Sequence, residues 1–346
     1  MAKEYAVAAL WIGGNLSYLE QLCLKSFVDA GQHTILYTYE GVTNAPEGVE
    51  MRDANEILSS DNLLTNERTG SPALHSDVFR YHMLAKHDDL IWVDTDAYCV
   101  RRFETPNGHM HAWESKHGIN GGVLGLPQDS ETLAAVLEMT KDPYGIPEWY
   151  KGEERAEMEA RMAAGNPVHA GEMRWGVWGP HALTHYLKKT GEVKYTLPQA
   201  ALYPVPYSDR MSMTRPGFAA DKYLTDETIS IHLYGRRMRA RLLEKFDGVA
   251  RPRSLIGRLL KKHGIDPAAA PIKRKAPAAA VETAEAAPVK AAVKKAAVKK
   301  TAAKPASPKA SATQKATTAK KPAATKKAAT SKTVASRATK PKGAKS

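Results

Sequence analysis

Apolar positions along the first forty residues follow two periodicities. Residues 4–12 form a continuous apolar run of strand length that ends at two glycines. Ser17 and Glu20 then have the spacing of a capping box, and apolar residues follow at helical spacing as far as Gly31, a residue typical of helix C-termini. Residues 33–40 form a second apolar run. A strand, a helix and a strand in this order favour an α/β fold with a mostly parallel sheet and a ligand crevice at the strand ends.

The same kind of pattern continues downstream. Apolar residues at helical spacing predict a second helix over 74–86, and a buried strand over 90–93 follows it at once. A charged segment predicts a helix on the surface over 153–162. Further strand-like runs cover 121–127, 201–207 and 228–235.

Charge divides the chain into two parts. The 346 residues include 50 Lys or Arg and 37 Asp or Glu. Residues 271–346 hold 20 of the basic residues and 2 of the acidic ones, which leaves 30 basic and 35 acidic residues in 1–270. The formal charges are therefore +18 and −5, so the basic pI of about 9.5 comes from the tail alone. We expect one globular domain over 1–265 and a disordered tail rich in Ala, Lys and Pro over 266–346.

The remaining composition favours a cytoplasmic protein. Two cysteines, Cys23 and Cys99, are too few for a disulfide framework and fit a reducing compartment. No run approaches the roughly 20 apolar residues of a membrane span. A basic tail also allows a peripheral location at the inner face of the membrane.

The run LIWVDTDAYCV contains the chemistry of most interest. On a strand, Asp94 and Asp96 point to the same side and Thr95 points away. Two converging carboxylates share a proton or hold a hard cation, and Mg²⁺ or Mn²⁺ is commonly held by one or two carboxylates together with substrate phosphates. The pattern therefore predicts a metal–diphosphate site, in which both aspartates should be poorly satisfied without metal. The alternative is an ordinary strand end whose aspartates cap a turn.

A second polar pair precedes this strand. Asp77 and Arg80 are three residues apart, on one face of the predicted helix. Their polar face can reach the same crevice, although a solvated ion pair of little energetic value is the alternative.

The combination of LWIGG, SDVFRY and an apolar strand that ends in DTD resembles the glycosyltransferases with a sugar-binding D-x-D motif. These include the α-1,4-galactosyltransferases, the initiating mannosyltransferases of yeast, bacterial capsule and lipopolysaccharide enzymes and, more distantly, the glucosylating clostridial toxins. INGGVLGLP, WGPHALTHYL and ISIHLYG look like later segments of the same family, so the resemblance covers about residues 5–240. It implies a GT-A fold, a nucleotide-sugar-binding sandwich, over residues 1–265.

The resemblance also implies roles for single residues. Trp11 would lie over the nucleobase of the donor, although a core aromatic is the alternative, and Asp77 would bind the donor sugar. Asn120 would face the sugar or the acceptor. His232 would help to close the site on the metal or the diphosphate, although a lone histidine is more often structural.

The expected catalytic set is Asp94, Asp96 and Arg80. Asp96 would ligate Mn²⁺ or Mg²⁺ directly with help from Asp94 and His232, and Asp94 would also contact donor hydroxyls. Arg80 would bind the donor and stabilise negative charge. The implied reaction moves a sugar from a nucleotide-diphosphate donor, with uridine diphosphate favoured over guanosine diphosphate, to a hydroxyl of a glycan or lipid-linked acceptor. The related families retain anomeric configuration.

Other candidate functions are weaker. The histidine pairs in HMH at 109–111 and HALTH at 181–185 lack the further ligands of a zinc site. The tail supports a different reading, in which the protein binds nucleic acid, anionic membrane or acidic polysaccharide nonspecifically through counterion release and its globular domain is inactive.

Overall fold

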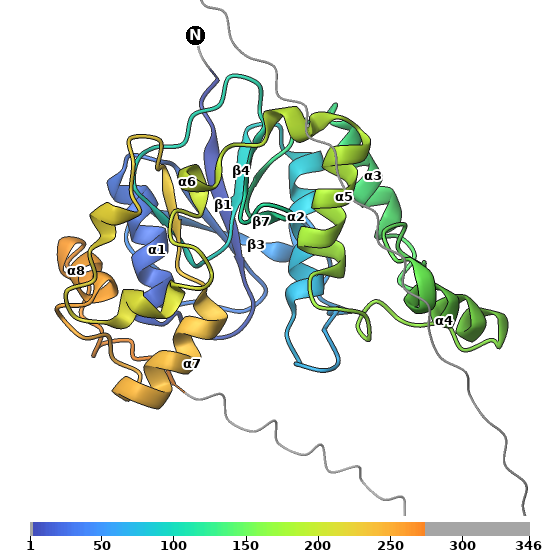
Figure 1. The fold of residues 1–346 in the computed structure, drawn as a ribbon. Helices are drawn as coiled ribbons and strands as arrows, with labels where there is room; N and C mark the ends of the chain where they lie inside the picture. The colour runs from blue at the N-terminus through green and yellow to red at the C-terminus, as the bar shows by residue number, and fades with distance from the viewer. Residues whose placement is uncertain (1–2, 274–346) are drawn as a thin grey trace, which may run out of the picture. The chain divides into compact units, whose positions relative to one another are not determined.

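A computed structural model describes residues 3–273 of the chain (Figure 1). The described residues all belong to one compact unit, 1–279. Packed structure continues past residue 265, because Ile272 is buried and the Tyr18 backbone N–H donates to the Ala270 carbonyl over 2.8 Å. The predicted disorder of the tail concerns residues that lie almost entirely outside the described part.

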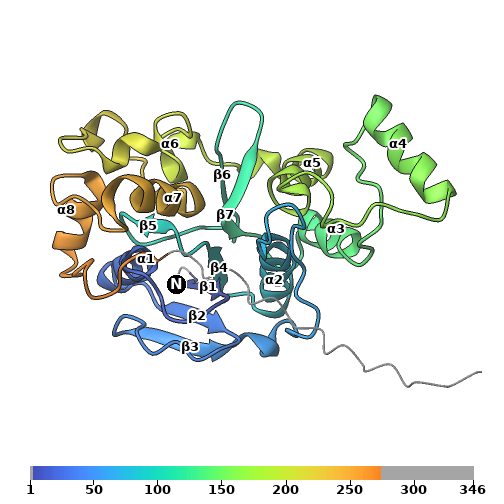
Figure 2. The same cartoon turned by 90° about the horizontal axis from the view of Figure 1, so that it is seen from below.

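Six strands form the central sheet, in the order β3-β2-β1-β4-β7-β6 (Figure 2). The pairings of β1 with β2, of β2 with β3 and of β1 with β4 are parallel, whereas β7 runs antiparallel to both of its neighbours. The expected α/β class with a mostly parallel sheet is confirmed. The strand bounds are β1 Ala6–Trp11, β2 Thr34–Thr38, β3 Val49–Asp53, β4 Leu90–Val93, β5 Ala97–Cys99, β6 Met110–Trp113, β7 Ile119–Gly125 and β8 Ser230–His232.

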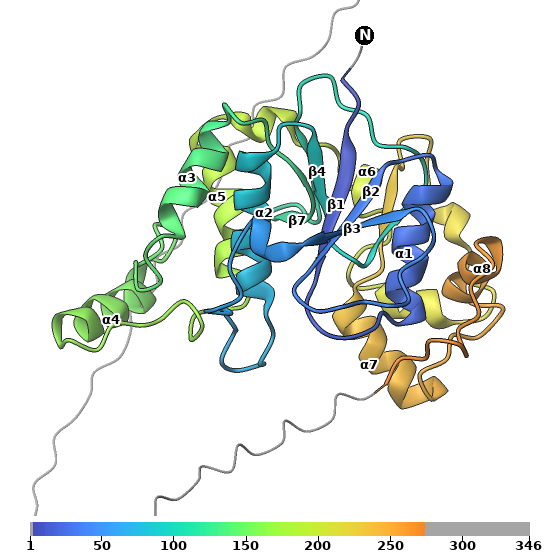
Figure 3. The same ribbon diagram turned by 180° about the vertical axis from the view of Figure 1, so that it is seen from behind.

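Helices cover both faces of this sheet (Figures 1 and 3). Side chains of β1 alternate between two cores: Ala8 and Leu10 pack with α2, α3 and α5, whereas Val7 and Ala9 pack with α1 and α6. This alternation is the two-residue period of a strand buried on both sides. The helix bounds are α1 Tyr18–Asp29, α2 Ala73–Lys86, α3 Glu131–Met139, α4 Gly152–Ala163, α5 Ala182–Lys189, α6 Gln199–Leu202, α7 Gly235–Phe246 and α8 Leu255–Lys262.

Most local predictions agree with the structure. The capping box is present, since the Ser17 backbone N–H donates to Glu20 over 2.8 Å and the Ser17 hydroxyl accepts from the Leu19 N–H over 3.3 Å. The helix expected at 74–86 is α2, and the charged segment is α4, which extends away from the sheet and buries only Met158.

The strand expected at 201–207 is wrong. Residues Ala201 and Leu202 complete the helical turn α6, and the chain then continues without regular structure. Two prolines, Pro204 and Pro206, remove backbone donors that a strand in the sheet would need. The run at 228–235 contributes a strand of only three residues, β8, which pairs with β5 in a separate two-stranded sheet.

Candidate functional site

The carboxyl ends of β1, β2 and β4 meet at one edge of the sheet. The chain leaves β1 towards β2 on one side, whereas β4 returns to pair with β1 on the other side. Strand order therefore reverses between β1 and β4, and α/β sheets bind ligands outside the strand ends at such a point. Trp11 ends β1, Asp94 directly follows β4, and a hollow of about 340 Å³ opens beside the ends of β2 and β3.

The two aspartates occupy a turn and not a strand. Asp94, Thr95 and Asp96 connect β4 to β5, and the Ala97 N–H closes the turn on the Asp94 carbonyl over 2.9 Å. The strand geometry assumed for these two residues is therefore wrong, and their positions are set by the turn and by separate partners. Asp94 has its partners on α2, whereas Asp96 has its partners around β8 and α7.

One oxygen of Asp94 is satisfied by the protein itself. Its Oδ1 accepts from the indole N–H of Trp92 over 2.8 Å and lies 3.4 Å from the Nη2 of Arg80. Its side chain keeps 30% of its surface exposed. Burial raises the pKa of Asp94, and the nearby Asp96 adds to this shift, whereas the positive charge of Arg80 opposes it. The expectation of a poorly satisfied carboxylate therefore does not hold for Oδ1 of Asp94, whereas Oδ2 accepts no hydrogen bond from residues 3–273.

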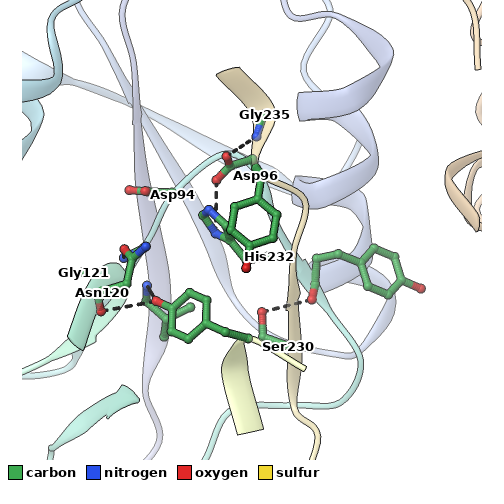
Figure 4. A network of polar contacts seen from close by, with 12 residues as sticks. Asp94, Asp96, Asn120, Gly121, Ser230, His232 and Gly235 are labelled. Carbon is green, nitrogen blue, oxygen red and sulfur yellow. Dashed lines mark hydrogen bonds and ion pairs between the residues drawn. The ribbon is translucent and has the colours of Figure 1, made fainter. Parts of the chain in front are cut away.

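Asp96 differs from Asp94 in this respect (Figure 4). Its Oδ2 accepts from the Gly235 N–H over 2.6 Å, while its Oδ1 is buried without a hydrogen-bond partner. The Nδ1 of His232 lies 3.7 Å from that oxygen, within ion-pair range if the imidazole is protonated, and also has no hydrogen-bond partner. A buried polar atom without a partner is unusual in a folded protein and calls for an explanation such as an ion. Two such atoms face each other here.

Glycines keep the space beside this pair open. A Cβ added at Gly122 would lie 3.2 Å from the ring of His232 and 3.3 Å from Oδ2 of Asp94. A Cβ at Gly121 would lie 2.7 Å from Nη1 of Arg80. Both glycines are in β7, which carries them past the aspartate turn, and the Asp94 N–H donates to the Gly122 carbonyl over 2.7 Å. Asp94 and His232 therefore border a common space over Gly122.

Arg80 lies in the interior, 5% exposed, and its donors are directed to protein acceptors. Nη1 donates to the Gly121 carbonyl over 2.7 Å, and Nη2 lies 3.2 Å from Asp77 and 3.4 Å from Asp94. Burial would lower the pKa of Arg80, but the two carboxylates outweigh it and raise that pKa. In this arrangement Arg80 positions Asp94 and links α2 to β7.

Asp77 lies behind Arg80 and is also buried. Burial raises the pKa of Asp77 to about 7, although the charge of Arg80 opposes the shift. Gly179, in the helical turn η2 (Val177–His181), has its backbone against this carboxylate, because an added Cβ would lie 2.7 Å from Asp77 Oδ1. The pair on α2 is therefore neither solvated nor open to the crevice.

Asn120 and Trp11 border the site with part of their surface exposed. The side-chain oxygen of Asn120 accepts from the Gly122 N–H over 2.8 Å, and within residues 3–273 its NH₂ group donates no hydrogen bond. The indole N–H of Trp11 donates to the Gly14 carbonyl over 2.7 Å, and the Arg239 guanidinium lies 5.7 Å from the Trp11 ring centre. Trp11 is thus only partly a core residue.

Sequence reasoning missed two charged residues beside Asp96. Arg239 of α7 pairs with Glu20 of α1, whose side chain is 1% exposed, through an Nε–Oε1 contact of 2.9 Å. A Cβ at Gly235 would lie 3.0 Å from Asp96 Oδ2 and 3.2 Å from Nη1 of Arg239, so the arginine borders the same space. The capping box explained Glu20 by local structure, and no sequence signal indicated its second partner 219 positions later.

The residues predicted to bind a metal fit an incomplete site. Within residues 3–273, no group of three or more His, Cys, Asp or Glu could hold a metal ion by itself. Asp96 and His232 nevertheless supply an unpartnered oxygen and an unpartnered nitrogen at 3.7 Å, and Asp94 borders the adjoining space. A divalent cation that takes its other ligands from substrate phosphates and water is compatible with this donor set.

The other histidine pairs form no comparable site. His109 stacks on Tyr195 and lies edge-on to His111, whose pKa burial lowers to about 4. His185 pairs with Glu148 on the surface. No helix in the described part of the chain is long and apolar enough to cross a membrane.

Comparisons with known proteins add little. No family model matches the chain, and no curated protein matches it. A solved structure described as a transferase mutant aligns with 49% of this chain and 88% of its own, at 12% identity and a TM-score of 0.28. A likeness this weak carries no weight for fold or function, so the chemistry of the site has to be inferred from its own residues.

Proposed function

We propose that this protein is a metal-dependent glycosyltransferase of the GT-A type, which moves a sugar from a nucleotide-diphosphate donor to an acceptor hydroxyl. The observation that carries the proposal is the buried, unpartnered pair of Asp96 Oδ1 and His232 Nδ1 at a switch point of a mostly parallel sheet. A cation bound there would satisfy both atoms. The resemblance of SDVFRY and DTD to the D-x-D glycosyltransferases agrees with this assignment.

Each residue has a distinct part in the proposed reaction. Mn²⁺ or Mg²⁺ would supply Lewis-acid neutralisation of the leaving diphosphate when bound. Asp96 and His232 hold that ion and Asp94 assists, while the Gly235 N–H fixes Asp96 and Arg80 fixes Asp94.

Recognition of the donor involves residues at the same edge. The partly exposed ring of Trp11 offers a surface for the nucleobase, preferably uracil and otherwise guanine. The free NH₂ of Asn120 can donate to the sugar or the acceptor. Asp77 is buried and does not reach the donor itself. It helps to hold Arg80, which in turn positions Asp94.

Bond changes follow from the charges. The bond between the anomeric carbon and the phosphate oxygen breaks, and its electron pair stays on that oxygen. The acceptor hydroxyl oxygen forms the new bond on the same face, and its proton passes to the leaving phosphate oxygen, which gives retention. Arg239, next to Asp96, adds positive charge near the developing phosphate charge.

A thermal-shift panel of nucleotide sugars tests the proposal. With Mn²⁺ present, a uridine or guanosine diphosphate sugar at about 100 times its Kd should stabilise the protein by about 2.7 kcal/mol, or roughly 5 °C or more. Asp96→Asn should lose this shift, whereas Asp89→Asn, at the opposite end of β4 and exposed, should keep it. If no such donor raises the melting temperature in the presence of metal, the proposal is wrong.

A second candidate function is favoured by the charge of the tail. Residues 271–346 have a formal charge of +18 and contain no aromatic residue, which fits nonspecific binding of a polyanion and excludes stacking on bases. Nucleic acid, an anionic membrane and acidic polysaccharide are the possible partners. This function needs no intact Asp96, so the two candidates can be separated.

A further inference from the structure

Two exposed aromatic rings contact arginines beside the proposed site. Trp175 and Tyr207 keep 38% and 44% of their surface exposed. The Arg236 guanidinium lies 4.5 Å from the Trp175 ring centre, and that of Arg210 lies 3.5 Å from the Tyr207 ring centre. The Nε of Arg237 donates to the Tyr207 hydroxyl over 3.2 Å. We call these five residues the Arg–aromatic rim.

The rim adjoins the metal-binding pair directly. Gly235, which donates to Asp96, immediately precedes Arg236 and Arg237 in α7. Tyr234 lies in the left-handed region at φ 54° and marks the sharp turn into this helix. The ring of Tyr234 contacts His232 at 4.5 Å between centres and Tyr207 at 5.5 Å. A continuous row of rings therefore runs from the metal-binding histidine to the rim.

The three arginines of the rim form no close ion pair with an acid. Within residues 3–273, Arg210, Arg236 and Arg237 form no ion pair within 4 Å. This concentration of positive charge contrasts with residues 1–273 as a whole, which have 31 basic and 35 acidic residues. Nη1 of Arg210 donates to the Tyr207 carbonyl. Arg236 and Arg237 donate no hydrogen bond through their Nη atoms within residues 3–273, so these donors can bind a carboxylate or a phosphate.

The proposed diphosphate site has an arginine of its own. Arg239 is the arginine whose Nη1 borders Asp96 Oδ2 over Gly235. Arg236 and Arg237 instead contact Trp175 and Tyr207, which belong to the chain segments before η2 and after α6. Tyr234 connects Tyr207 to His232, so the rim extends outward from the histidine of the proposed site.

We propose that the Arg–aromatic rim binds an acceptor saccharide that carries an anionic group. The apolar face of a sugar ring packs on Trp175 or Tyr207, and a carboxylate or phosphate on that saccharide pairs with Arg236 and Arg237. This assignment rests on the proposed glycosyl transfer and specifies the class of acceptor.

Binding of three probes to the full chain, measured by calorimetry, tests the assignment. The probes are maltotetraose, maltotetraose with a 6-phosphate, and a hyaluronan tetrasaccharide that carries carboxylates. At least one charged probe should bind about tenfold more tightly than maltotetraose, and the order of the two charged probes identifies the preferred anion. The double variant Arg236→Gln, Arg237→Gln should lose most of that preference and leave maltotetraose binding unchanged.

A matched control distinguishes binding by the rim arginines from nonspecific attraction to the positive charge of the whole protein, including its tail. Arg215→Gln, Arg253→Gln removes the same charge from exposed positions that make no side-chain contact with the rim, and it should keep the preference. Trp175→Ala should weaken the binding of all three probes to the same extent. The assignment would be overturned if the two double variants lost the preference for charged probes equally. It would also be overturned if the wild-type protein bound charged and neutral probes equally.

The donor measurement keeps this result separate from the proposed function. The Arg236→Gln, Arg237→Gln variant should retain the Mn²⁺-dependent shift with a nucleotide sugar, because the proposal assigns Arg239, and not these two arginines, to the donor diphosphate. Loss of that shift would place the arginines at the donor and overturn the acceptor assignment. If the wild-type protein shows the preference among saccharides but no donor shift, glycosyl transfer fails while the saccharide surface stands.

Discussion

Two carboxylates one residue apart have opposite surroundings in this protein. Asp94 is engaged by Trp92 and Arg80, whereas one oxygen of Asp96 is buried with no partner except the facing nitrogen of His232. Their spacing in the sequence identified both as candidates. It could not separate them, because the partners that do so come from distant parts of the chain.

Asp77 should make stability depend on pH. Its folded pKa of about 7 lies above the value of roughly 3.9 in an unfolded chain, so the folded state binds more protons between these values. The contribution of Asp77 to the free energy of unfolding is fully present below about pH 4 and is lost as pH rises through 7. Asp77→Asn imitates the protonated form, so its melting temperature relative to wild type should increase between pH 5 and pH 8.

Asp61→Asn is a suitable control for this measurement, since Asp61 is exposed. Its melting temperature relative to wild type should change little over the same pH range. A constant difference for Asp77→Asn would show that Asp77 is already ionised at pH 5.

At the scale of elements, Glu20 connects two helices. One oxygen accepts from the Ser17 backbone at the start of α1, and the other accepts from Arg239 in α7. The local half of this arrangement was predictable, because a capping box lies within four residues. The other half was not, and neither was the pairing of β5 with β8, since both depend on how the chain returns after more than a hundred residues.

Glu20→Ala should therefore cost far more than removal of the cap alone. Ser17→Ala should lower the free energy of unfolding by about 1 kcal/mol. Glu20→Ala also leaves Arg239 without its buried partner, which typically costs about 3–5 kcal/mol. Denaturant unfolding of both variants measures the difference, and similar losses would mean that the Glu20–Arg239 pair contributes little.

At the scale of the whole molecule, hydrophobic periodicity predicted the α/β class, the parallel part of the sheet and the strand β4 that precedes the aspartates. It missed β3, β5 and β6, which are short or partly exposed and have weak apolar patterns. Charge showed where the composition changes, but packing continues to Ile272, because a few apolar residues still dock on the domain.

Removal of residues 274–346 should separate the two candidate functions. That segment has 19 basic and 2 acidic residues. A chain that ends at Lys273 should lose salt-sensitive binding to double-stranded DNA and keep any donor shift in Mn²⁺. Asp96→Asn in the full chain should keep the binding to DNA and lose the donor shift. DNA binding that survives the truncation would place the polyanion site in the globular part.

The contact between Asp96 and Gly235 spans 139 positions, and this separation has a consequence for biosynthesis. At about 5–20 residues per second, a ribosome needs roughly 7–28 s to make the intervening chain. Until then the Asp96 carboxylate lacks both the amide that fixes it and the imidazole that faces it. A nascent or prematurely terminated chain therefore cannot assemble the pair, so the proposed activity would arise only after nearly all of the described chain has been made.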